Sequence, residues 1–155
     1  MRKKAVLVLA AAAIFMVPST ATAATNDSSS DNGVSSAYGP GAFITNGDNV
    51  HISSTPPPTA SGHGWWVKVS GPGTTAKVTV WLQSNWAGSG WVTRATGVKT
   101  VKSGGGSANR ATARWQCRNL VAKVQWRSVI DVDLIGVADS PERAVTATRT
   151  LYCGV

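Results

Sequence analysis

The sequence has few residues of the kinds that carry acid–base chemistry. Only seven of its 155 residues are acidic, Glu142 is the single glutamate, and there are two histidines, His51 and His63. A serine nucleophile needs an oriented base, and neither histidine lies in a recognisable catalytic motif. The segment Gly88-Ser89-Gly90 lacks the leading glycine of the nucleophile elbow of serine hydrolases. A serine hydrolase is therefore not expected.

The remaining acid–base candidates are two aspartates, Asp131 and Asp133. On one strand face their carboxylates would lie about 7 Å apart, a separation compatible with glycosidic chemistry or with a calcium ligand pair. The simpler interpretation is two exposed aspartates that face arginines on a neighbouring strand. Asp48, His51 and His63 have no diagnostic ligand spacing. We therefore predict neither an enzyme nor a metal site or cofactor.

Long apolar runs are also scarce. The only one, residues 5–17, follows the basic stretch Arg2-Lys3-Lys4 and precedes the small-x-small pattern Ala21-Thr22-Ala23. These are the parts of an export signal that is cleaved. Thirteen apolar residues are too few to span a bilayer comfortably, so no stable membrane insertion is expected. We predict a signal peptide over 1–23 and a secreted mature chain of 132 residues, the size of one domain.

Cysteine occurs only twice, at Cys117 and Cys153. Two cysteines in an exported protein are expected to form a disulfide. The bridge would tie the last strand of the chain to the strand that ends near Cys117.

Acidic residues are missing from a long central part of the chain. Between Asp48 and Asp131 there is none, whereas ten basic residues lie there. The mature chain carries 12 basic and 7 acidic residues, a net charge of +5. This distribution indicates either an anionic partner (a wall polymer, lipid headgroups or an acidic protein) or an ordinary solvated face. Nucleic acid is not expected, because no nucleic-acid fold motif is present.

The pattern that is present is period-two alternation. Residues 111–117 alternate, with Cys117 on the inward face, and the alternation resumes in residues 120–127, with Leu120 inward, and again in 130–134. Such runs predict half-buried antiparallel strands. Together with the other short strands they indicate an all-β fold, a single antiparallel immunoglobulin-like β-sandwich over 41–155, with a partly closed barrel as the alternative.

Further strands are predicted on both sides of these runs. Residues 43–45 and 50–52 flank Asn46-Gly47-Asp48 and predict a hairpin. Residues 77–83 predict a strand with alternate side chains inward, and 144–153 predict the final strand. Residues 24–40 have little apolar content before the domain and predict a flexible tail.

Seven tryptophans stand out in a chain of this size, and two of them, Trp86 and Trp91, bracket a glycine-rich loop. Trp115 and Trp126 lie on inward faces, whereas Trp81 should face solvent or a second layer. Exposed indoles on a β-sandwich stack on sugar rings or anchor protein interfaces. The alternative is that they fill the core.

Three stretches, 49–66, 104–114 and 126–136, resemble a group of small exported actinobacterial β-sandwich proteins. The resemblance spans most of 49–153 and implies the fold without a chemistry. The layout of a flexible tail ahead of a sandwich is similar to the adaptor subunit of umbrella-shaped secreted toxin particles. This second resemblance is one of layout only, and it implies a bridging role between secreted subunits.

We therefore expect a secreted, non-catalytic binding protein. The first hypothesis is an adaptor subunit of an extracellular protein complex, such as a secreted toxin particle. Its partners would be other secreted protein subunits, bound through the N-terminal segment and the exposed tryptophan loops. The expected binding residues are Tyr38, Phe43, Ile44, Trp86 and Trp91. The alternative is a carbohydrate or cell-wall binding module that takes an anionic polymer or glycan.

Overall fold

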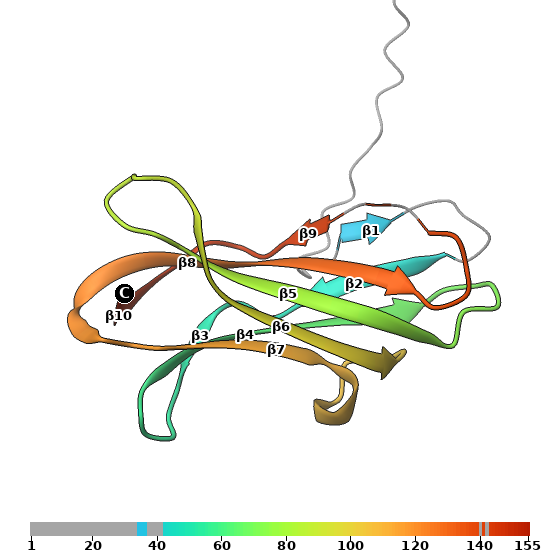
Figure 1. The fold of residues 1–155 in the computed structure, drawn as a ribbon, viewed down its shortest axis with the longest axis horizontal. Helices are drawn as coiled ribbons and strands as arrows, with labels where there is room; N and C mark the ends of the chain where they lie inside the picture. The colour runs from blue at the N-terminus through green and yellow to red at the C-terminus, as the bar shows by residue number, and fades with distance from the viewer. Residues whose placement is uncertain (1–33, 37–41, 140, 142) are drawn as a thin grey trace, which may run out of the picture.

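Figure 1 shows a computed structural model built almost entirely from strands, which describes residues 34–36, 42–139, 141 and 143–155. The elements are β1 (Val34–Ser36), β2 (Phe43–Gly47), β3 (His51–Ser53), β4 (Thr59–Lys68), β5 (Thr75–Asn85), β6 (Val92–Lys102), a 3-10 helix (Ser107–Asn109), β7 (Ala111–Gln116), β8 (Asn119–Leu134), β9 (Arg143–Val145) and β10 (Arg149–Gly154).

Two of the predicted segments fall mainly on residues that the structure does not describe. The predicted signal peptide lies wholly outside the described residues, and of the predicted tail only β1 is described. No helix among the described residues is long and apolar enough to cross a membrane.

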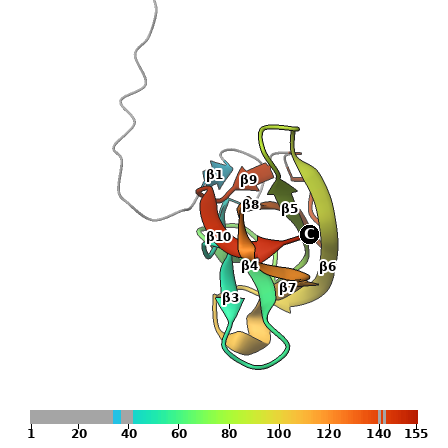
Figure 2. The same cartoon turned by 90° about the vertical axis from the view of Figure 1, so that its left-hand side faces the viewer.

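The strands form two antiparallel sheets that pack face to face. In the first sheet, β4 lies between β7 on one edge and β2 with β3 on the other, and β1 extends from β2. In the second sheet the order is β10-β8-β5-β6, and β9 shares the edge of β8 with β10. Figure 2 shows this arrangement end-on. The prediction of an antiparallel β-sandwich is confirmed.

The strand order is that of an immunoglobulin-like sandwich. When β2 and β3 count as one strand and β9 and β10 as another, and the short added strand β1 is set aside, seven strands remain. The first, second and fifth form one sheet, and the seventh, sixth, third and fourth form the other.

The predicted hairpin around Asn46-Gly47-Asp48 is replaced by a bulge in one interrupted strand. Gly47 pairs with Gly64 and His51 pairs with Ser61, both on the same edge of β4. Three residues, 48–50, therefore face only two on β4, which is the two-against-one count of a β-bulge. The turn residues do interrupt the strand. Pairing with β4 nevertheless keeps β2 and β3 collinear, so the chain does not reverse direction there.

The interior follows the period-two pattern of β5 and β8. Val78, Val80 and Leu82 of β5 are completely buried, as predicted, and so are Ser128 and Ile130 of β8. The two predicted runs 120–127 and 130–134 form one continuous strand. Leu120 is an exception to the predicted inward face, since it is 51 % exposed where β8 begins.

Two tryptophans fill the core and satisfy their indole N–H groups there. Trp66 and Trp126 are fully buried. The Nε1 atom of Trp66 donates to the carbonyl of Val101 at 3.2 Å, and that of Trp126 donates to the carbonyl of Cys153 at 3.1 Å. Burying an indole without such a partner would cost the desolvation of its N–H. The core prediction is confirmed for Trp126, whereas Trp115 is only half-buried.

The predicted disulfide joins Cys117 to Cys153, whose Cα atoms lie 4.8 Å apart. It ties the end of β7, in the first sheet, to β10, in the second. Closing a loop over 36 positions removes about 4 kcal/mol of unfolded-state entropy in the chain-entropy model. The bridge therefore links the two sheets covalently, beside the hydrogen bond from the backbone N–H of Arg118 to the carbonyl of Gly154.

At the other edge of the sandwich, β6 and β7 approach each other closely, as Figure 2 shows. The approach depends on Gly97, because a Cβ at that position would overlap the carbonyl group of Thr112 and lie 2.9 Å from the backbone nitrogen of Ala113. Both obstacles are backbone atoms, which cannot rotate away.

We expect Gly97→Ala to destabilise the protein by about 1–3 kcal/mol, the usual cost of overpacking a rigid site. Urea denaturation of the variant would measure this loss. Gly106→Ala is the matched control, because a Cβ there meets no atom within 4 Å. Equal unfolding midpoints for the two variants would contradict the role assigned to Gly97.

Candidate functional site

The two predicted tryptophan anchors have different surroundings in the structure. Trp86 lies in the β5–β6 loop, which projects from one end of the sandwich (Figure 1), and its side chain is 43 % exposed. The carbonyl of Trp86 accepts hydrogen bonds from the backbone N–H and the hydroxyl of Ser89. Gly88 and Gly90 adopt positive φ angles of 78° and 97°, which suit glycine. The loop is thus a hydrogen-bonded turn that presents Trp86.

Trp91 is half-buried beneath an arginine. The guanidinium of Arg127 lies 4.1 Å from the centre of the Trp91 ring, and its Nε atom donates to Oε1 of Gln83 at 2.9 Å. Burial lowers the pKa of the Arg127 guanidinium. Cation–π contacts with arginine are strongest when the cation is partly desolvated in this way. Trp91, Arg127 and Gln83 therefore form one ordered unit.

The three predicted binding residues near the N-terminus, Tyr38, Phe43 and Ile44, do not form an exposed group among the described residues. Tyr38 lies outside the described residues. Phe43 is 3 % exposed and packs edge-on against Trp66, with ring centres 6.4 Å apart, so it is a core residue. Ile44 is half-buried on β2, opposite Val67. Of the two that the structure describes, only Ile44 is partly accessible.

A second arginine–tryptophan stack lies on the same side of the second sheet. Trp81 is half-buried, and the guanidinium of Arg143 lies 4.6 Å from the centre of its ring. We name the outer surface of this sheet the tryptophan–arginine face. Its defining residues, on or packed against β5, β8 and β9, are Trp81, Gln83, Trp91, Arg127 and Arg143. Sequence alternation places Trp81 and Arg127 outward, but only strand pairing brings each beside its partner.

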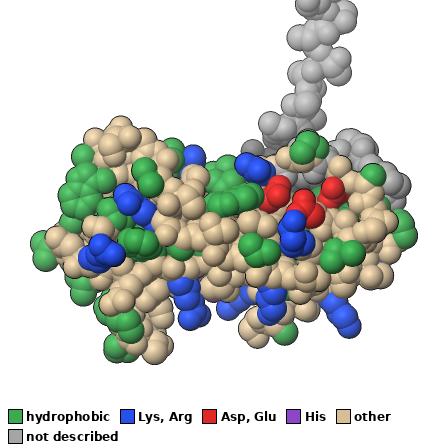
Figure 3. All heavy atoms as spheres, in the orientation of Figure 1, with side chains coloured by type: hydrophobic (Ala, Val, Ile, Leu, Met, Phe, Trp, Pro, Cys, Tyr) green, Lys and Arg blue, Asp and Glu red, His purple; other side chains and the backbone are tan. Residues whose placement is uncertain are grey.

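Exposed apolar side chains accompany these stacks. Val98 pairs with Thr79, Val145 with Val129, and Tyr152 with Lys123, and the three are 58 %, 46 % and 52 % exposed. Figure 3 looks onto this side of the molecule and shows apolar side chains along much of its length.

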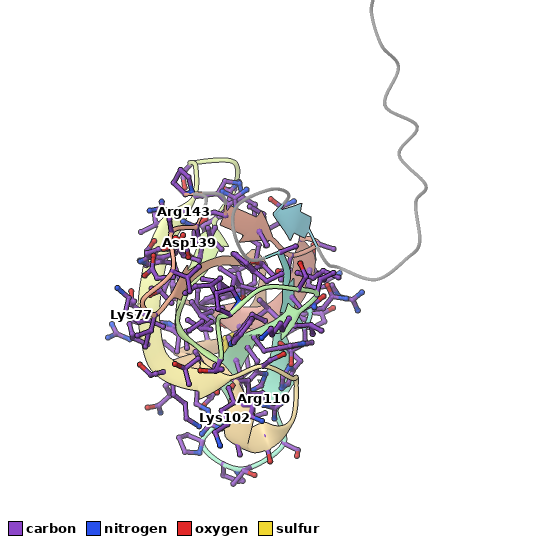
Figure 4. All side chains as sticks on the ribbon, turned by 90° about the vertical axis from the view of Figure 1, so that its right-hand side faces the viewer. Lys77, Lys102, Arg110, Asp139 and Arg143 are labelled. Carbon is purple, nitrogen blue, oxygen red and sulfur yellow. A yellow bond between two sulfur atoms is a disulfide. The ribbon has the colours of Figure 1, made fainter. Side chains whose placement is uncertain are left out.

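The two predicted aspartates lie on the same face and are paired with basic groups. A carboxylate oxygen of Asp133 is 2.8 Å from Nζ of Lys77, and Asp131 is 3.7 Å from Nε of Arg143. Asp139 lies nearby and accepts a hydrogen bond from the backbone of Leu134. Figure 3 shows acidic side chains gathered beside basic ones on this face, and Figure 4 labels Asp139 on the same side of the molecule as Lys77 and Arg143. The arrangement matches the simpler sequence interpretation in that both aspartates face basic groups on neighbouring strands, one of them a lysine, but it differs in that Asp131 is not exposed, since only 19 % of its side chain is accessible.

Positive charge dominates the rest of the described surface. Twelve lysines and arginines are described, and only Lys77 and Arg143 have a carboxylate within salt-bridge distance among the described residues. Five of the other ten lie on β6, on β7 or directly before β7, and one of these is Arg94, which donates to the hydroxyl of Ser84. The remaining four are named the basic margin: Lys99, Lys102, Arg110 and Arg114. In Figure 4, Lys102 and Arg110 lie close together, away from Lys77 and Arg143.

A small hollow lies beyond the end of β7. It is lined by Trp115, Gln116 and Arg118, has a volume of about 260 Å³, and the guanidinium of Arg118 lies 5.4 Å from the centre of the Trp115 ring. The hollow presents an aromatic ring and a cation to solvent at one place.

The histidines, which sequence spacing does not connect to any site, meet at the bulge of the first sheet. Asp48, His51 and His63 each offer a ligand atom, and these atoms lie within 4.8 Å of one another. Burial raises the pKa of the Asp48 carboxyl, but hydrogen bonds from the His63 ring and backbone outweigh it, so the pKa lies below its ordinary value. These are the described residues best placed to hold a metal ion.

Comparisons with known proteins find no match for this chain among family models, curated protein sequences or solved structures.

We expect Asp131→Asn to stabilise the protein at neutral pH. Burial, followed by the charge of Asp133, raises the pKa of Asp131 above its ordinary value, so the folded state disfavours its charge. The raised pKa means that wild-type stability rises as the pH falls through the folded pKa of Asp131. The gain from Asp131→Asn should thus be present above that pKa and vanish below the unfolded value. Denaturation midpoints between pH 3 and pH 7 would measure it.

Asp133→Asn is the control for this prediction. It removes the hydrogen-bonded ion pair with Lys77, which also raises the pKa of that lysine, and so should not stabilise the fold. A stabilisation by Asp133→Asn equal to that of Asp131→Asn would contradict the assignment.

Proposed function

We propose that the protein is a secreted, non-catalytic binding protein that acts as an adaptor subunit in an extracellular protein complex. The observation that carries the proposal is the composition of the tryptophan–arginine face. Protein interfaces are enriched in tryptophan, tyrosine and arginine and are depleted of lysine and glutamate at their centres. Two tryptophan–arginine stacks and three exposed apolar residues on one sheet surface fit that composition.

The order of the stacked side chains also supports binding. Arg127 is held between the Trp91 ring and Gln83, so little of its rotamer freedom remains to be lost when a partner covers it. Immobilising a long side chain on association costs about 0.5–1.5 kcal/mol. Groups held in place before binding avoid this cost, as at interface hot spots.

The N-terminal segment provides a second contact in the proposal. Val34–Ser36 pairs antiparallel with Phe43–Thr45 at the edge of the first sheet. An edge that accepts one added strand offers main-chain hydrogen bonds to an extended partner segment. The similarity of layout to the adaptor of umbrella-shaped toxin particles points to other secreted subunits as the partners.

The test is recovery of companion proteins with the native secreted chain. We expect wild-type protein to co-purify with at least one other secreted protein, identified by mass spectrometry. Trp86→Ala or Trp91→Ala should weaken the complex by about 2 kcal/mol or more, roughly 30-fold in Kd, as hot-spot truncations do.

Val69→Ala is the matched control, because Val69 is 62 % exposed but follows β4 in the first sheet. It should leave the complex intact. A wild-type chain that runs as a monomer with no companion would refute the adaptor proposal.

A second candidate function is favoured by the basic margin and by the hollow at Trp115 and Arg118. The ten described cations without a carboxylate partner would attract an anionic wall polymer. An aromatic ring beside a guanidinium can stack on a sugar while the cation binds an acidic substituent. This arrangement would suit a binding module for an anionic glycan.

We expect charge reversal at Lys99→Glu/Lys102→Glu to reduce retention on an anionic wall polysaccharide at least about fourfold, because exposed ion pairs contribute about 0.2–1 kcal/mol each. The control, the double substitution Lys123→Glu/Arg149→Glu, makes the same change of charge on β8 and β10 and should reduce retention less. Equal retention of both variants and wild type in a pull-down would exclude the basic margin as a polymer site.

A further inference from the structure

The bulge between β2 and β3 places an aspartate over the neighbouring strand. Because residues 48–50 face only two residues of β4, the strand bends there. Asp48 uses the bend to reach His63 with both carboxylate oxygens. Oδ1 accepts the backbone N–H of His63 at 2.9 Å, and Oδ2 lies 2.6 Å from the ring atom Nδ1.

This contact determines the state of the His63 ring. An ionised carboxylate only accepts, so without a bound ion this hydrogen bond places a proton on Nδ1 of His63. A divalent ion that takes the place of this proton would bind Nδ1 and Oδ2 together, because metal binding to histidine requires a ring nitrogen without a proton. His63 is only 5 % exposed, so its ring is held in place by the fold.

The second histidine closes the cluster from the solvent side. His51 stacks on His63 with ring centres 5.4 Å apart and planes inclined by 25°. His51 itself is exposed, so an ion can enter from solvent. Donor atoms around one Zn²⁺, with bonds of about 2.0–2.2 Å, lie about 3–4 Å apart. The observed spread of up to 4.8 Å therefore needs a shift of about 1 Å, which the exposed ring can make.

An independent observation at the same place points to a ligand. Ser61 of β4 pairs with His51 of β3 and lies two residues before His63, so the three side chains leave the same face of the first sheet. Ser61 is 2 % exposed, and its hydroxyl has no hydrogen-bond partner among the described protein atoms. An unpartnered buried hydroxyl costs free energy unless a bound group satisfies it.

We propose that Asp48, His51 and His63 form a binding site for a divalent transition-metal ion, with Zn²⁺ as the best match. Two imidazoles and one carboxylate are zinc ligands, whereas calcium and magnesium prefer sites made entirely of oxygen. Three protein ligands leave a fourth position for a water or carboxylate that the Ser61 hydroxyl can bind. The ion would join β2 and β3 to β4 on the sheet opposite the tryptophan–arginine face, so the site is independent of the proposed adaptor function.

The test is a calorimetric titration of the full-length, chelator-treated chain with Zn²⁺ at neutral pH. We expect one ion per chain and a rise in the unfolding temperature on saturation. His51→Gln should weaken binding at least about tenfold, since even outer-sphere changes cost 10-fold to 100-fold. Because His51 is exposed, this variant should fold, which circular dichroism would verify. Both histidine rings should shift in NMR spectra of the wild type when Zn²⁺ is added.

Asp133→Asn is the control, since Asp133 belongs to the acidic group on the other sheet; it should bind Zn²⁺ like wild type. Ser61→Ala should weaken binding less than His51→Gln does. The proposal is overturned by a wild-type titration without saturable one-to-one binding. It is equally overturned by unchanged affinity in His51→Gln, or by loss of affinity in Asp133→Asn as large as that in His51→Gln.

Discussion

The antiparallel ladder between β5 and β8 is the constraint on which the rest of the structure depends. It runs without interruption from the pair Ala76 and Leu134 to the pair Asn85 and Gln125. Because successive side chains point to opposite faces of a sheet, the register between β5 and β8 determines which side chains enter the core and which lie on the outer surface. The inward set is the core of the second sheet, and the outward set contains Lys77 opposite Asp133 and Gln83 opposite Arg127. A slip of one residue would exchange the two sets.

The first sheet makes room for the side chains of this ladder because the centre of β4 carries glycines on its inner side. Gly62 and Gly64 lie on the inner side of β4, and a Cβ at Gly64 would lie 2.8 Å from methyl groups of both Ile130 and Val80. The bulky side chains of the second sheet therefore pack against the backbone of β4. Close packing at this point leaves the polar residues of β4, His63 and Ser61, on its other face, where the bulge of β2 and β3 covers them.

The two candidate sites thus lie on opposite faces of the sandwich and have different chemistry. The tryptophan–arginine face is broad, aromatic and partly apolar, which suits a macromolecular partner. The cluster at the bulge is small and built from nitrogen and oxygen donors, which suits an ion. An ion bound there would stabilise the edge of the first sheet on which β1 lies.

The sequence by itself determined the all-β sandwich, the disulfide, the inward face of β5 and the inward face of β8 from Val124 onward. These depend on local period-two patterns and on the presence of only two cysteines, which can be read without knowing which strands pair. Tertiary structure decided what depends on register between distant segments. Residues 48–50 form a bulge because β4 pairs with both flanking strands, and Phe43 enters the core beside Trp66. Asp48 meets His63 across fifteen positions, because a bulge shifts strand register by one residue and no local pattern reports that shift.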